Sequence, residues 1–158
     1  MPAPAAVLLQ TPNIATALVH MSPEQIAEVY AKGETAEIPH GRARGVAMLF
    51  PRSGLAPVLA KLARLIWQGK IFDAQAGTLV NQVIGLHLIP AKLYHGPSWF
   101  DSGDAVIIDY EHTSMGFSRI RDEIRLIAPD YWLGRSYYRR GEKGPYVLSF
   151  GLDFRTAP

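Results

Sequence analysis

Residues 145–154 have the sequence PYVLSFGLDF, and this stretch decides the fold class. Every second position carries an apolar side chain: Tyr146, Leu148, Phe150, Leu152 and Phe154. An alternation with a period of two predicts a β-strand that buries one face. The loop RGEKG at 140–144 joins this strand to YWLGRSYYR at 131–139, so the two segments predict a β-hairpin.

The same rhythm of short apolar runs and turn residues extends back to Trp67. It predicts strands over 67–72, 78–84, 89–94, 98–101 and 105–110. The clearest hairpin is expected where 98–101 turns through Ser102-Gly103-Asp104 into 105–110, because Val106, Ile107 and Ile108 strongly favour strands.

Residues 120–127 fit two interpretations. Ile120, Ile124 and Ile127 have the spacing of a helical stripe, whereas Ile120, Ile124 and Leu126 share one face of a strand. We adopt the strand, because a clear hairpin follows directly after Pro129-Asp130.

The first part of the chain differs from this pattern. Residues 1–21 are rich in Ala and Pro, which predicts a loosely attached N-terminal arm. Residues 22–66 are expected to be a helical segment with one strand. Ser22 as N-cap, followed by Pro23 and Gln25, begins a helix over 23–32. A strand is expected within 37–50, and apolar residues at helical spacing predict a second helix over 54–66.

These elements predict a mainly β fold in one domain, 1–158, in which two N-terminal helices precede a β-meander over 67–154. Closure of the sheet would remove exposed strand edges, so we expect an antiparallel, closed or nearly closed β-barrel. A barrel of about eight strands is wide enough to pack its own side chains or to enclose one small ligand.

Composition excludes several classes of function. Lys plus Arg exceed Asp plus Glu by only 16 − 14 = 2, which is too small an excess for a nucleic-acid binder. The absence of cysteine excludes a disulfide scaffold, a thiolate zinc site and a cysteine nucleophile. The histidines are scattered without metal-ligand spacing, so we expect no metal and no cofactor.

Hydrophobic residues make up 48% of the chain and charged residues 19%, which predicts a packed core. No run approaches the roughly twenty apolar residues of a membrane span, and no Lys or Arg opens the chain as in a signal peptide. We therefore expect a soluble, cytoplasmic protein.

The densest polar stretch lies between Asp109 and Arg125. On a strand, Arg121, Glu123 and Arg125 project to one face and Asp122 to the other. Two interpretations stay open for this row. It is a charge ladder on the wet side of the barrel, or it lines the interior, where Arg beside a carboxylate would hold a carboxylate or carbonyl of a ligand.

Asp122 stands among apolar strand neighbours. A core-facing carboxylate must be paired or protonated, although a β-bulge would turn it outward instead. The candidate catalytic residues are Asp122 and Glu123, with Tyr110 as an acid. The candidate ligand-binding residues are Arg121, Arg125, Arg135, Tyr137, Trp99, Tyr94 and Trp132, because Arg anchors polar groups and aromatic side chains edge small-molecule pockets. Lys70 and Asn81 are expected at the surface.

Four short stretches carry a resemblance to known proteins. They are WQGKIFD at 67–73, GPSWFD at 96–101, RDEIR at 121–125 and YWLGR at 131–135. These stretches resemble bacterial proteins of unassigned function, and the rhythm over 67–154 is similar to that of the lipocalin-like, or calycin, barrels. The chain lacks the Gly-x-Trp landmark of lipocalins near a first strand. The resemblance implies a lipocalin-like barrel that binds a lipid, a pigment or another apolar molecule, with some relatives using the cavity for isomerisation or cyclisation.

The expected function is therefore the binding of a hydrophobic small molecule, such as a lipid, pigment or polyketide-like compound, that carries one polar or anionic group. The alternative is a cofactor-independent isomerase, cyclase or lyase that acts on such a molecule in the same cavity. A third expectation is an interaction module that forms a homodimer through a sheet face or the N-terminal arm.

Overall fold

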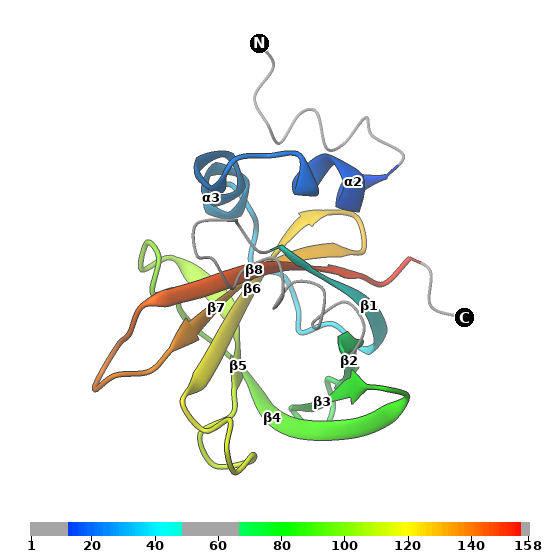
Figure 1. Ribbon diagram of the computed structural model, residues 1–158, viewed down its shortest axis with the longest axis vertical. Helices are drawn as coiled ribbons and strands as arrows, with labels where there is room; N and C mark the ends of the chain where they lie inside the picture. The colour runs from blue at the N-terminus through cyan, green and yellow to red at the C-terminus, as the bar shows by residue number, and fades with distance from the viewer. Residues whose placement is uncertain (1–12, 49–66, 156–158) are drawn as a thin grey trace.

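The computed structural model describes residues 13–48 and 67–155. Eight antiparallel strands close into a barrel in which each strand pairs with the next and β8 returns to β1 (Figure 1). The strands are β1 (Gly41–Met48), β2 (Trp67–Asp73), β3 (Thr78–Val83), β4 (Leu86–Pro97), β5 (Asp104–Asp109), β6 (Ile120–Ala128), β7 (Tyr131–Tyr138) and β8 (Tyr146–Asp153). The predicted fold class, a mainly β and closed antiparallel barrel, is confirmed.

Residues 120–128 form strand β6, which confirms the strand interpretation of the ambiguous segment. This strand pairs with β5 on one side and β7 on the other, from Ile120 opposite Tyr138 to Ala128 opposite Tyr131. Its alternating side chains therefore face the interior and the exterior of the barrel in turn.

The strand predicted over 98–101 is wrong. Strand β4 instead runs to Pro97, which lies opposite Asp104 of β5, and residues 98–103 form the connecting loop. Side chains bond to the local backbone there: the Ser98 hydroxyl accepts from the Phe100 amide at 3.0 Å, and Asp101 accepts from the Gly103 amide at 2.9 Å. Such bonds stabilise turns at the expense of strand pairing.

The helix predicted after Ser22 is α3 (Pro23–Ala31), with the expected capping box between Ser22 and Gln25. A shorter helix, α2 (Ile14–Val19), lies within the stretch that we expected to be a loose arm. Ile14 and Leu18 are buried, so this part of the N-terminal region is packed against the barrel. The helix predicted over 54–66 lies outside the described residues. Among the described helices, none has the length and apolar character needed to cross a bilayer.

The barrel wall separates two apolar cores. The interior core fills part of the inside of the barrel and contains Phe72, Leu79, Val106, Ile108, Ile124, Trp132, Phe150 and Leu152. The exterior core joins α2 and α3 to the outside of the wall and contains Ile14, Leu18, Ile26, Val29, Tyr30, Met48, Ala128, Tyr131 and Leu133. Figure 1 shows both helices together on one side of the barrel. The exterior of β6 and β7 is thus partly covered by α2 and α3.

An irregularity in β2 changes which of its side chains face inward. The register with β3 shifts between Trp67 and Gly69, and Gly69 has a φ of +147°. A Cβ atom at Gly69 would lie 2.0 Å from the carbonyl oxygen of Ala43, so only glycine fits there. Because of this bulge, Trp67 and Lys70 both line the interior.

Candidate ligand cavity and the two polar clusters of the barrel wall

The interior of the barrel holds a cavity of about 400 Å³. It lies toward the end where β3 and β5 finish and β6 begins. Most of its wall is apolar and comes from several strands: Ala47, Trp67, Val83, Ile89, Ile120, Leu148 and Phe150. The volume and the apolar wall are typical of small-molecule sites.

A compact polar cluster stands in this apolar wall. The Lys70 ammonium donates to Asn81 Oδ1 at 2.8 Å and to the Tyr110 hydroxyl at 2.6 Å, and it lies 3.2 Å from Asp122 Oδ2. Asn81 Nδ2 donates to the Tyr110 hydroxyl at 3.0 Å, and this hydroxyl donates to Asp122 Oδ2 at 3.4 Å. Lys70, Asn81, Tyr110 and Asp122 therefore form one connected network, the inner cluster residues.

Burial makes this network electrostatically strong. Each of the inner cluster residues exposes 4% or less of its surface. Burial alone would lower the pKa of Lys70, but Tyr110 and Asp122 beside it outweigh burial and raise that pKa above its usual value. Burial raises the pKa of Tyr110, and the Lys70 charge opposes this only in part. Burial therefore keeps the Tyr110 hydroxyl protonated, and the Asp122 carboxylate, 3.2 Å from Lys70, is the charge that stabilises the Lys70 ammonium.

One atom of the network has no hydrogen-bond partner among residues 13–48 and 67–155. Asp122 Oδ1 is buried and makes no hydrogen bond within the described part of the chain. An unsatisfied buried acceptor costs about 1–3 kcal/mol, and more when it is charged. Asp122 is also a lining residue of the cavity, so an unsatisfied acceptor lies within the cavity wall.

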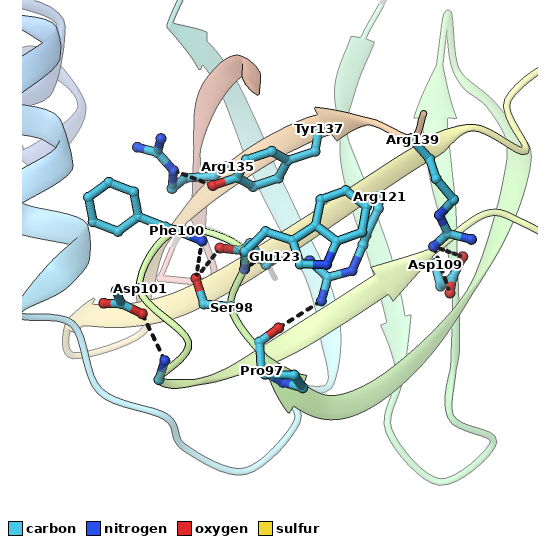
Figure 2. A network of polar contacts seen from close by, with 12 residues as sticks. Pro97, Ser98, Phe100, Asp101, Asp109, Arg121, Glu123, Arg135, Tyr137 and Arg139 are labelled. Atoms are coloured by element: carbon cyan, nitrogen blue, oxygen red, sulfur yellow. Dashed lines mark hydrogen bonds and ion pairs between the residues drawn. The ribbon is translucent and has the colours of Figure 1, made fainter. Parts of the chain in front are cut away.

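A second polar cluster lies on the outer face of the same wall (Figure 2). Glu123, which is fully buried, accepts hydrogen bonds from the Tyr30 hydroxyl at 2.9 Å, the Trp99 amide at 2.8 Å and the Ser98 hydroxyl. Arg121 donates to the same carboxylate at 2.7 Å. The two oxygens of Glu123 are thereby saturated, which leaves them no capacity for a ligand.

Arg125 extends this outer cluster. Its guanidinium makes a two-pronged contact with the Asp101 carboxylate, at 2.7 Å and 2.8 Å, and its Nε donates to the Asp104 carbonyl oxygen. The hydrogen bond from Arg125 lowers the pKa of Asp101 below its usual value, although burial opposes the shift. Arg125 therefore fastens the 98–103 loop to β6.

Arg135 is held mainly by aromatic rings. Its guanidinium carbon lies 4.3 Å from the centre of the Phe100 ring and 4.4 Å from that of Tyr146, and its Nε donates to the Tyr137 hydroxyl at 2.9 Å. Figure 2 shows Arg135 beside Tyr137 and Phe100 on the outer side of the wall. These contacts are cation–π interactions that hold the loop in place.

The structure divides the predicted site residues between the two sides of the wall. Tyr110 and Asp122 line the cavity. Trp132 also faces inward, but it lines a separate pocket toward the far end of β6, together with Leu126 and Phe154. The remaining candidates lie outside the barrel wall: Arg121, Glu123, Arg125, Arg135, Tyr137, Trp99 and Tyr94.

The two interpretations of the Arg121 row are therefore both corrected. The row faces away from the cavity, yet it is not on a wet face, because Arg121 and Arg125 expose only 4% and 3% of their surfaces. The 98–103 loop and Tyr30 of α3 cover it. Sequence alternation gave the correct grouping of residues but contained no information about this cover.

Two residues of the cavity were wrongly expected at the surface. Asn81 lies on the same strand face as Leu79, which is buried, and Val83, which lines the cavity, so alternation along β3 was a usable signal. Lys70 shares a strand face with buried Phe72. Strict alternation would place Trp67 on the opposite face from Lys70, and the bulge at Gly69 brings both to the same face. A lone lysine in an apolar run gave no indication of its partners.

Comparisons with known proteins give information on the fold only. No family model and no curated protein sequence matches the chain. Among solved structures, the crystal structure of a protein from Thermomonospora curvata superposes with a TM-score of 0.61 at 17% sequence identity. The match covers 95% of this chain and 97% of that chain. At this identity the likeness shows a shared fold, and function has to be argued from the site.

Proposed function

We propose that this barrel binds an apolar small molecule in its interior, in the manner of a lipocalin-like carrier. The observation that carries the proposal is the cavity of about 400 Å³, whose described lining residues are apolar except for the inner cluster residues and Ser136. An eight-stranded barrel is wide enough to hold one small ligand, and ligand sites combine an apolar wall with few polar groups.

The surface near the cavity supports the same proposal. Apolar side chains are exposed on the β3–β4 hairpin, where Ile84 is 68% and Leu86 60% exposed. On the loop that leads into β6, Met115 is fully exposed and Phe117, which lines the cavity, is 46% exposed. Exposed apolar groups around a cavity are typical of ligand-binding openings.

Binding of the neutral fluorescent probe N-phenyl-1-naphthylamine tests the proposal. Ser136→Phe places a ring in the cavity and is expected to abolish the fluorescence increase. Val147→Phe is the matched control, because Val147 is 47% exposed on β8. It is expected to bind the probe like the wild type. Equal binding by a folded Ser136→Phe variant would contradict the proposal.

A second candidate function uses the same cavity. The unpaired Asp122 Oδ1 beside the protonated Tyr110 is the arrangement of a base and an acid, which favours a cofactor-independent isomerase, cyclase or lyase. Glu123 has no part in this version, because it lies outside the wall. Turnover of an added substrate that survives Asp122→Asn would contradict it.

A further inference from the structure

The hydrogen bonds inside the cavity restrict which polar group a ligand can carry. An ammonium has three donors, and those of Lys70 are directed to Asn81, Tyr110 and Asp122. Lys70 is therefore a cation whose hydrogen-bonding capacity is already used, and it offers no free donor to a ligand.

The neighbouring donors are used as well. Asn81 Nδ2 donates to the Ile89 carbonyl oxygen at 2.9 Å and to the Tyr110 hydroxyl at 3.0 Å. The indole of Trp67 donates to Asn81 Oδ1 at 3.1 Å, and the Tyr110 proton is directed to Asp122 Oδ2. Within the described part of the chain, the atom of this network that lacks a hydrogen-bond partner is an acceptor, Asp122 Oδ1.

The charges of Lys70 and Asp122 further restrict the polar group that a ligand can carry. Lys70 and Asp122 compensate one another, so the network is neutral as a unit. Ser136, which lies opposite Asp122 on β7, adds one hydroxyl to the cavity wall. A ligand carboxylate would meet the Asp122 carboxylate with only this hydroxyl as a donor, and an alkylammonium would bring an uncompensated charge into an apolar space. A neutral group that donates a hydrogen bond fits both conditions.

We propose that the guest is an apolar molecule bearing a hydroxyl group, and that this hydroxyl donates its hydrogen bond to Asp122 Oδ1. The inference rests on the proposed function, because it specifies the ligand class for the same cavity. It replaces the expected anionic guest and its arginine anchors, since those arginines lie outside the wall.

Displacement of N-phenyl-1-naphthylamine by three decyl compounds tests the inference at neutral pH. They are 1-decanol, methyl decyl ether, which keeps the oxygen but lacks the donor, and decanoate. A hydrogen bond to a charged acceptor predicts that 1-decanol binds about tenfold or more tightly than the ether, with decanoate weakest. Affinities of alcohol and ether within about threefold, or tightest binding by decanoate, would overturn the inference while leaving the cavity proposal intact.

The variant Asp122→Asn tests whether Asp122 is the residue that causes the preference for 1-decanol over the ether. Lys70 requires an acceptor, so the amide oxygen of the new side chain takes the place of Oδ2 and its NH₂ group points into the cavity. The preference for 1-decanol over the ether is expected to disappear, and decanoate is expected to gain affinity. An unchanged preference in the folded variant would contradict the assignment. If the variant does not fold, the wild-type series alone decides the inference. Failure of every compound and of the probe itself to bind would remove the proposed function as well.

Discussion

Two neighbouring carboxylates on β6, Asp122 and Glu123, face opposite sides of the barrel wall. Asp122 lines the cavity, and one of its oxygens has no hydrogen-bond partner among the residues that the structure describes. Glu123 is enclosed by Tyr30, Ser98, Trp99 and Arg121 and uses both oxygens. At the scale of single residues, the first is available for a ligand and the second serves the structure.

Glu123→Gln tests this division of roles. A glutamine keeps one acceptor oxygen, places an NH₂ group against existing donors and leaves the Arg121 charge unpaired. Loss of one partner of a buried ion pair costs about 3–5 kcal/mol of unfolding free energy, measurable by urea denaturation. Probe binding at low temperature is expected to stay unchanged. The exposed Glu142→Gln is the control, and loss of probe binding in a folded Glu123→Gln protein would contradict the division.

At the scale of elements, the bulge in β2 brings Trp67 and Lys70 to one side of the wall. Gly69→Ala combines an unfavourable φ with a Cβ only 2.0 Å from the Ala43 carbonyl oxygen. We expect a loss of at least about 2 kcal/mol in unfolding free energy, together with weaker probe binding.

Gly141→Ala separates the two causes. Gly141 also has a positive φ of +73°, but nothing lies within 4 Å of its Cβ position. Backbone strain alone predicts a loss of about 1 kcal/mol there, without an effect on the probe. Equal losses at Gly69 and Gly141 would show that the close backbone approach in β2 has no energetic importance.

The 98–103 loop depends on the contact between Asp101 and Arg125. Because the pKa of Asp101 is lowered below 3.8 in the folded state, its charge stabilises the fold above that pH. This contribution is lost as the pH falls through the folded-state value. Urea midpoints between about pH 6 and about pH 3 are expected to fall less steeply for Asp101→Asn than for the wild type. Asp104→Asn is the control for an exposed aspartate of β5, and identical slopes for Asp101→Asn and the wild type would contradict this account.

At the scale of the whole molecule, much of the barrel could be predicted from the sequence. Alternation in Tyr146–Asp153 identified the inward face of β8, and Leu148, Phe150 and Leu152 do face the interior. The strand at 120–128 followed from the adjacent hairpin. Period-two patterns are local, so one sequence is enough to find them.

What the sequence could not reveal depends on contacts between distant segments. The Gly69 bulge requires Ala43 from β1, and the cover over the Arg121 row requires Tyr30 from α3. The site was therefore found only in part, as Tyr110 and Asp122 without Lys70 and Asn81. A contact such as that between Tyr30 and Glu123, which are 93 positions apart, leaves no local pattern in the residues themselves.

The measurement that tests the central claim most directly is an isotope-filtered NOE experiment on methyl-labelled protein with 1-decanol. Leu148 and Val83 line the cavity, whereas Val147 lies on the outer surface of the same strand as Leu148. The account predicts NOEs from the decyl chain to the methyl groups of Leu148 and Val83, and none to Val147. Contacts with Val147 in the absence of any contact with Leu148 or Val83 would show that the interior of the barrel does not receive the molecule.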